Sequence, residues 1–154
     1  MTERTNVEQY LNRLKKGLNT EYTIRKLHDS LYQAGPEKVL IHATKPDSDT
    51  YFFGFQPAFM EEANQVILIC GNDLCAFKLP VTLLKQLPFN TDPKTDRNLT
   101  TVGYDGEQHY WWMSLKKDNE GSRLDISRFF VNLKSEEEVM AEALALRELL
   151  GLSD

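Results

Sequence analysis

The sequence predicts an α+β fold in which a mainly antiparallel sheet of about six to seven strands, arranged in hairpins, is flanked by helices. Short apolar runs of strand length, separated by turn residues, fill the middle of the chain, whereas apolar residues at helical spacing occupy both ends. One further helix is expected between two of the strands. Strands grouped in the middle with helices at the ends are typical of α+β proteins.

The best-defined segment lies near the middle of the chain and predicts a strand, a strand and a helix. Five consecutive apolar residues, Val66–Cys70, are too few for a helix and rich in β-branched types, which indicates a central strand buried on both faces. The Gly-Asn-Asp sequence that follows favours a turn, and Leu74–Leu79 returns as a second strand. Pro80 suits the first position of a helix over Val81–Leu87. The residues expected in the core are Ile67, Ile69 and Leu84.

Two helices are predicted at the N-terminal end. Asn6 can cap the first helix, whose apolar positions recur at helical spacing, and Gly17 ends it. The second helix begins at Thr20 and carries apolar residues on one side as far as Tyr32. The Gly-Pro pair at residues 35–36 then stops it.

Two further strands are predicted before the central segment, over Lys38–Thr44 and Tyr51–Phe55, and a turn at residues 46–49 joins them as a hairpin. Residues 56–64 contain a proline and are expected to form a connection with one helical turn at most. Residues 88–99 hold two prolines and few apolar side chains. An irregular segment of this length is often a binding loop, which makes it a candidate for function.

A three-stranded meander is predicted in the last third of the chain. The Asp-Gly pair at residues 105–106 favours a hairpin turn between Thr100–Tyr104 and Glu107–Leu115. The Asn-Glu-Gly sequence at residues 119–121 favours another turn before Arg123–Ile126. The three strands are therefore expected to pair in chain order.

A closing helix is predicted at the C-terminal end. Ser127 is first expected to cap a short turn. Ser135 and Glu138 then form a capping box for the last helix, and Gly151 supplies its stop. The apolar stripe of this helix consists of Val139, Met140, Ala143, Leu146 and Leu150.

Length and composition indicate a soluble globular protein. A chain of 154 residues can build one hydrophobic core, so a single domain over residues 1–154 is expected. No apolar run approaches the roughly 20 residues that span a bilayer, and no signal-peptide pattern is present, so we expect a cytoplasmic protein that does not contact membranes. In that compartment Cys70 and Cys75, opposite each other across the predicted turn, are expected to be free thiols.

Charge is unevenly distributed along the chain. The formal net charge is −5, and residues 135–154 contain one base and six acids, which leaves 17 bases and 17 acids over the other 134 residues. A neutral body lacks the basic excess of a tight, non-specific nucleic-acid binder. A specific binder, however, can concentrate its bases on one face.

The sequence lacks the local motifs of several enzyme classes. It contains no phosphate-binding GxxxxGK[ST] loop, no dinucleotide-binding GxGxxG, no GxSxG nucleophile turn and no HExxH zinc motif. His28, His42 and His109 lie on different predicted elements, and no cysteine stands at metal-ligand spacing from them. We therefore assign no catalytic residue, no metal site and no cofactor.

The middle third of the chain resembles the core of restriction-endonuclease-type nucleases, with a helix, hairpins with an acidic turn, and a strand that carries a lysine. Such nucleases bind Mg²⁺ through an Asp and through an acidic residue or Gln two positions before the Lys. Asp47 would supply the first ligand, but Ala76 stands two positions before Lys78 and cannot bind a metal. The resemblance therefore implies a nuclease only with a non-standard acidic cluster, made of Asp47, Asp49, Glu61 and Glu62.

The most unusual local sequence is His-Tyr-Trp-Trp-Met at residues 109–113. In a strand, Tyr110 and Trp112 point to one face, and Trp111 and Met113 point to the other together with the histidine. One set fills the core, and the other set needs a cover from the chain itself or from a ligand. Aromatic rings beside cations are suited to stacking on a base while contacting phosphate. The alternative is a strand buried on both faces whose neighbouring lysines protect an exposed edge.

Three functions remain open at this point. The one we favour is a non-catalytic nucleic-acid-binding module, of the kind attached to restriction and other defence systems, that reads a modified or flipped base. The second is a metal-dependent nuclease that uses the acidic cluster, and the third is a protein–protein adaptor that uses the acidic C-terminal helix. The predicted nucleic-acid-binding residues are Trp111, Trp112, Lys116, Lys117, Arg123 and Arg128, together with Lys94 and Arg97 from the irregular loop.

Overall fold

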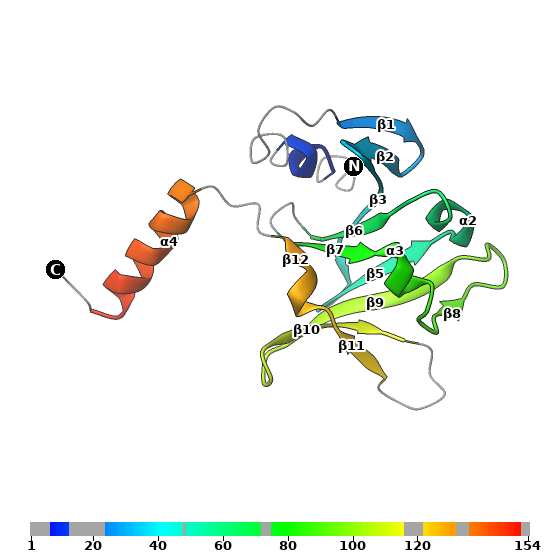
Figure 1. Ribbon diagram of the computed structural model, residues 1–154. Helices are drawn as coiled ribbons and strands as arrows, with labels where there is room; N and C mark the ends of the chain where they lie inside the picture. Colours follow the sequence, from blue (N-terminus) through cyan, green and yellow to red (C-terminus); the bar gives the residue numbers. More distant parts are fainter. Residues whose placement is uncertain are drawn as a thin grey trace.

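Two six-stranded sheets, A and B, pack face to face in the computed structural model (Figure 1). The structure describes residues 7–12, 24–47, 49–71, 75–115, 122–131 and 136–151. The predicted α+β class with mainly antiparallel pairing is confirmed, although the strands divide between two sheets.

Sheet A has the strand order β1-β2-β3-β6-β7-β12 and is antiparallel except for the parallel pair β3 and β6. The two central strands, β3 and β6, pair with each other although residues 45–64 separate them in the chain. The strands are β1 (Ile24–His28), β2 (Leu31–Ala34), β3 (Glu37–Thr44), β6 (Gln65–Cys70), β7 (Ala76–Pro80) and β12 (Phe130–Val131).

Sheet B is antiparallel and has the order β11-β10-β9-β5-β4, with β8 also paired to β9. Its strands are β4 (Pro46–Asp47), β5 (Thr50–Phe55), β8 (Asn90–Thr91), β9 (Asn98–Asp105), β10 (Tyr110–Ser114) and β11 (Arg123–Asp125). The remaining named elements are α2 (Pro57–Met60), α3 (Val81–Leu84), the 3-10 turn η1 (Ser127–Phe129) and α4 (Glu136–Leu149).

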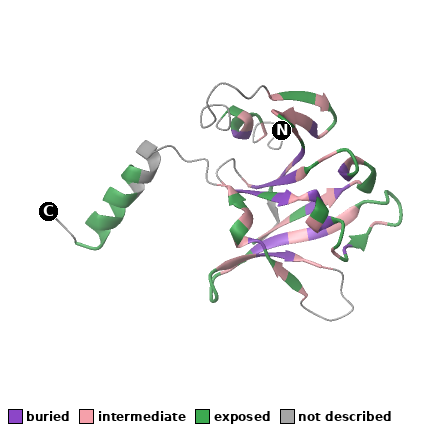
Figure 2. Cartoon of the chain, viewed as in Figure 1, coloured by how far each residue is buried: buried purple, intermediate pink, exposed green. Residues whose placement is uncertain are grey.

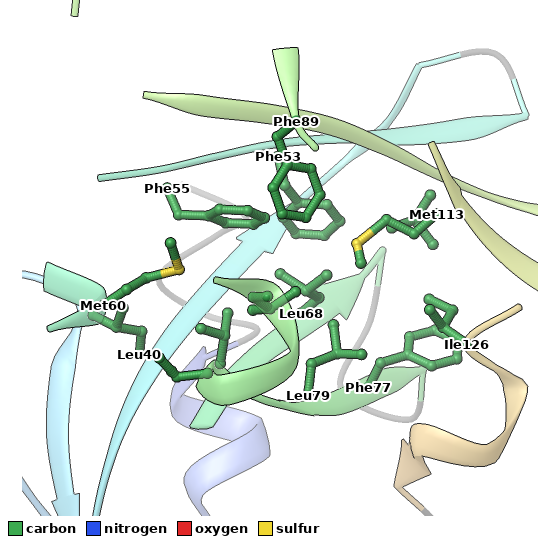
Figure 3. Packing of buried hydrophobic residues seen from close by; sticks show 14 of the residues in the cluster. Leu40, Phe53, Phe55, Met60, Leu68, Phe77, Leu79, Phe89, Met113 and Ile126 are labelled. Atoms are coloured by element: carbon green, nitrogen blue, oxygen red, sulfur yellow. The ribbon is translucent and has the colours of Figure 1, made fainter. Parts of the chain in front are cut away.

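The main hydrophobic core fills the space between the two sheets. Figure 3 shows aromatic side chains of β5 facing aliphatic side chains of β3, β6 and β7, with Met113 of β10 and Ile126 closing one end. The single-turn helices α2 and α3 add Met60, Val81 and Leu84 to the same cluster. Because both sheets contribute one face to this core, it holds the two sheets together.

A second cluster lies on the other face of sheet A. Val39 and Ile41 of β3 and Ile67 and Ile69 of β6 pack there against Tyr10, which belongs to the helix of residues 7–12. In Figure 1 this helix lies on the side of sheet A that is remote from sheet B. Sheet A is therefore covered on both faces, which explains why β6 is a continuous apolar run.

The central segment has the predicted strand, strand and helix order. β6 is buried on both faces, and Ile67, Ile69 and Leu84 are buried as expected. Pro80 differs from the prediction: it ends β7 and precedes the helix as its cap residue, because its backbone is extended (φ −64°, ψ 135°). Of the turn predicted at residues 71–73, Asn72 and Asp73 lie outside the described residues, as does Leu74.

The helix predicted from Thr20 to Tyr32 is wrong, because residues 24–34 form the antiparallel hairpin β1-β2. A β-bulge between Lys26 and His28 brings Leu27 and Leu31 to the same core cluster. A hairpin with a bulge can therefore bring apolar residues four positions apart to one cluster, as a helix does. Gly35 opens the two-residue turn to β3 in the left-handed conformation (φ 60°), so the Gly-Pro pair is a hairpin turn and not a helix stop.

The hairpin predicted between Lys38–Thr44 and Tyr51–Phe55 is also wrong. Both segments are strands, but β3 pairs with β2 and β6 in sheet A, whereas β5 pairs with β4 and β9 in sheet B. The apolar residues of β3 on both faces need cover on both sides, and only the middle of sheet A provides it.

The meander of β9, β10 and β11 is confirmed. Its first turn is longer than expected, since residues 106–109 all belong to it and His109 is left-handed (φ 58°), so this histidine is not on the strand. Ser127 does not cap η1; its hydroxyl accepts a hydrogen bond from the backbone N–H of Trp111 (2.9 Å).

The last helix, α4, forms as predicted and ends at Gly151, which is left-handed (φ 72°). The capping serine lies outside the described residues. Figure 1 shows α4 apart from the two sheets, and Figure 2 shows that its described side chains are exposed, with Leu149 reaching 83%. Among the described residues, no helix is long and apolar enough to cross a membrane.

Candidate nucleic-acid interface

The face of sheet B that points away from sheet A is the candidate site, and we call it the open face. Strand pairing places Phe52 of β5, Thr101 of β9, Ser114 of β10 and Arg123 of β11 in one row across it. Four neighbouring strands at roughly 4.8 Å spacing make this row roughly 14 Å wide. In Figure 1, sheet A and the N-terminal helix lie on the other side of sheet B from the open face.

Trp112 lies flat on this face between a glycine and an arginine. A Cβ atom at Gly103, the residue opposite Trp112 on β9, would lie 2.7 Å from the indole Cε2, so only glycine leaves room for the ring. The guanidinium of Arg123 lies 4.0 Å from the ring centroid on the other side. Both faces of the indole are thus covered and Trp112 is 9% exposed, so its ring is not open to a base; it instead holds the Arg123 guanidinium flat.

Phe52 is the exposed aromatic ring of the open face, with 53% of its surface accessible. Next to it on the strand, Gly54 carries no side chain, and the aliphatic part of Arg97 and the side chain of Leu99 lie against that position. An exposed ring flanked by an arginine is the arrangement that base stacking with a phosphate contact requires.

The loop that carries Arg97 is shaped by Asp92. The Asp92 carboxylate accepts hydrogen bonds from the backbone N–H of Lys94 (2.9 Å) and from the Thr95 hydroxyl (2.9 Å), and these bonds lower the pKa of Asp92. The Asp92 N–H donates to the Arg97 carbonyl (2.9 Å), and Asp96 adopts a left-handed conformation (φ 58°). The predicted binding loop is therefore a turn with defined bonding, which presents Arg97 beside β5.

A cavity of about 400 Å³ opens at the edge between the two sheets, beside Phe52. His42 of β3 and Phe53 of β5 line its inner wall, and Arg97 and Thr95 line the loop side. The His42 Nε2 atom is buried and has no hydrogen-bond partner within the described part of the chain. Burial, aided by the positive charge of Arg97, lowers the pKa of His42 to about 4, so the imidazole is neutral at neutral pH.

Trp111 points to the opposite side from Trp112, into the space between the sheets. Its ring lies 5.2 Å from Phe77, 5.3 Å from Tyr104 and 6.4 Å from Tyr51, measured between ring centroids. The two neighbouring tryptophans are therefore separated by the sheet, and Trp111 belongs to the packing of the main core.

The other residues predicted to bind nucleic acid lie at several places. Lys94 is exposed in the loop that carries Arg97. The guanidinium of Arg128 lies 4.7 Å from the ring centroid of Phe129 on η1, in no row of the open face. Lys116 and Lys117 lie outside the described residues. Of the predicted set, the structure brings together Trp112 with Arg123, and Arg97 with Lys94.

The acidic cluster of the nuclease hypothesis does not assemble in the described part of the chain. Glu61 pairs with Lys85 (3.0 Å) and Glu62 lies 3.4 Å from His28, while the side chain of Asp47 is not described. Among the described residues no group of three His, Cys, Asp or Glu side chains could hold a metal ion.

The two cysteines are free thiols that face each other, with the Cys70 N–H donating to the Cys75 carbonyl (2.7 Å). A side-chain hydrogen bond with Cys75, together with burial, raises the pKa of the Cys70 thiol, which stays protonated at neutral pH.

Comparisons with models of protein families, with curated proteins and with solved structures found no match for this chain. Its candidate site therefore depends on geometry alone. Sequence reasoning missed Phe52 and His42. An aromatic pair at residues 52–53 on an alternating strand was a usable signal for Phe52, because one of the two rings had to face outward. No local signal marks His42.

Proposed function

We propose that this protein is a nucleic-acid-binding module that uses the open face of sheet B, with no catalytic role for that face. Phe52 stacks on a base, while Arg97 and the Arg123 guanidinium held on Trp112 contact phosphates. A location in the cytoplasm and a role beside a defence nuclease belong to the same proposal; the free thiols are consistent with the first.

The observation that carries the proposal is the exposed Phe52 ring on a sheet face that has Arg97 near Gly54 and Arg123 at the far end of the same row of residues. With half its surface in water, the Phe52 ring is accessible to a ligand that would stack on it. Stacking on an aromatic ring is tolerant of sequence, because every base has a π-face. The arginines add the salt-dependent contacts to phosphate that such binding needs.

The test is a set of binding titrations with labelled oligonucleotides of about 12 nucleotides, single-stranded and duplex. Phe52→Ala should weaken binding by about 1–3 kcal/mol. Arg97→Ala and Arg123→Ala should weaken binding to all sequences alike and each reduce the salt dependence by about one unit of slope.

Two matched controls keep this test specific to the open face. Phe130 is also a partly exposed phenylalanine, but it lies on β12 of sheet A, and Arg25 is an exposed arginine on β1 at the other edge of that sheet. Phe130→Ala and Arg25→Ala should leave binding unchanged. Equal losses in the control variants, or no measurable binding by the unaltered protein, would refute the proposal.

A second candidate function is protein–protein adaptation through α4. Its exposed large apolar side chains are Met140, Leu144, Leu146, Leu149 and Leu150. Acidic residues are concentrated in the same segment, so the partner this helix suits is a protein with an apolar groove and a basic rim. Leu146→Glu would abolish such docking without affecting the open face, which separates the two functions.

A further inference from the structure

We propose that the cavity beside Phe52 receives a single unpaired nucleobase, and that His42 hydrogen-bonds to the edge of that base. This inference rests on the proposed function and names the part of the nucleic acid that is read. The open face alone would bind any strand by stacking and charge, whereas a cavity with a hydrogen-bonding wall discriminates.

The cavity has the size and lining of a small-ligand site. Its volume of about 400 Å³ falls within the roughly 300–1,000 Å³ typical of such sites. Phe53 and Leu99 supply apolar wall, while Thr95, Asp92 and Arg97 supply polar groups on the loop side. The lining is more polar than apolar, so Phe53 and Leu99 can contact the face of a flat heterocycle while the polar groups contact its edges.

His42 is the residue that indicates a base as the ligand of the cavity, and not an anion. A buried polar atom normally has a hydrogen-bond partner, and the Nε2 atom of His42 has none among the described residues. The residue lines the cavity, so a small rotation of its ring would present this buried atom to a ligand there. The imidazole is neutral at neutral pH, because burial and Arg97 lower its pKa to about 4. The Nε2 atom of a neutral imidazole is a donor or an acceptor according to the tautomer, so it can make one hydrogen bond to the polar edge of a base.

The rest of the nucleotide is accounted for by residues at the mouth of the cavity. Phe52 lines the mouth and is exposed toward the open face, so it can stack on the base that enters or on its neighbour. Arg97 lies on the loop side of the mouth, within reach of the phosphate of the same nucleotide. Binding of one extruded base is therefore continuous with binding of the strand on the open face.

The experiment compares a matched duplex with the same duplex carrying one mismatched base, because an unpaired base is cheaper to extrude. The unaltered protein should bind the mismatched duplex about ten-fold more tightly, and His42→Leu should remove most of that preference, since the base edge then loses its partner. His42→Gln, which keeps a donor and an acceptor at a similar position, should restore much of it. The His42 ring nitrogen signals in NMR spectra should shift on addition of the mismatched duplex.

The outcomes separate this inference from the proposed function. Binding of both duplexes with equal affinity, unaffected by His42→Leu, would overturn the inference and leave the open-face proposal intact. No binding of any oligonucleotide would overturn both. A third arm uses free nucleoside monophosphates: if these bind in a His42-dependent manner while the mismatch gives no preference, the cavity is a site for free nucleotides and the inference is wrong.

Discussion

Among the described residues, apolar clusters cover both faces of sheet A but only one face of sheet B. The central strand β6 of sheet A buries every residue from Val66 to Cys70, and apolar clusters lie on both sides of it. On β5 of sheet B, by contrast, Phe53 is 3% exposed and Phe52 is 53% exposed. A sheet with one open face normally places polar residues there, so the aromatic and glycine content of the open face requires another explanation.

The difference shows which apolar residues serve folding and which are available for binding. In sheet A most apolar residues belong to the two core clusters, and Phe130 at the edge strand β12 is an exception. In sheet B, Gly103 and Trp112 form a flat platform for Arg123, and Gly54 leaves space beside Phe52.

The largest effect is expected in the covered sheet. Ile69→Ala should lower the free energy of unfolding by about 2–5 kcal/mol, because Ile69 is fully buried in β6 and its truncation leaves a cavity. Chemical denaturation measures this change. A loss below about half a kcal/mol would mean that the second cluster is not part of the stable core.

Three of the six strands of sheet A, β3, β6 and β7, could be predicted from local sequence, but the pairing of the strands could not. The run Val66–Cys70 identified a two-sided strand because five consecutive residues are apolar. The partner of β6 on one side is β3, which pairs with it in parallel across more than 20 residues of chain, and no local pattern encodes that choice. The same limit produced the incorrect β3-β5 hairpin.

The candidate site was only partly predictable for the same reason. Trp112 and Arg123 belong to one meander, so their proximity followed from the predicted turns. His42, Phe52 and Arg97 come from β3, β5 and the loop before β9, and only the packing of two sheets brings them to one cavity. Sequence spacing carries no information about a contact of that kind.

The second expected effect is a pH dependence at the edge between the sheets. The pKa of His42 is lowered from 6.5 to about 4 in the folded protein, so between these pH values the unfolded chain binds a proton that the folded chain does not. Stability therefore falls as the pH falls from 6.5 to 4, by about 3 kcal/mol in total. Above pH 6.5 this histidine contributes no pH dependence.

Denaturation curves of the unaltered protein and of His42→Gln measure this effect. The other titrating groups are shared, so the extra loss of the unaltered protein on acidification isolates His42. Parallel pH profiles for the two proteins would show that the imidazole is not held in its neutral form.

The third effect concerns the platform on the open face. Gly103→Ala should destabilise the protein by about 1–3 kcal/mol, because the new Cβ atom would overlap the Trp112 ring. Gly106→Ala is the matched control, since a Cβ atom there meets nothing within 4 Å. The double variant Gly103→Ala with Trp112→Leu should recover part of the lost free energy of unfolding. If it recovers none, the destabilisation does not come from overlap with the indole ring.

The smallest effect on stability is expected at Phe52, and this result would define the open face most sharply. Phe52→Ala should change the free energy of unfolding by no more than about 0.5 kcal/mol, because the ring is more than half exposed and touches no buried cluster. Phe53→Ala, one residue along the same strand, should cost about 3–5 kcal/mol, because its ring lies in the main core. Since Phe52→Ala is also expected to weaken nucleic-acid binding, this variant would lose function and keep stability, whereas Phe53→Ala would lose stability. A loss of several kcal/mol for Phe52→Ala would instead mean that the open face is covered by the chain itself, and the binding proposal would lose its main support.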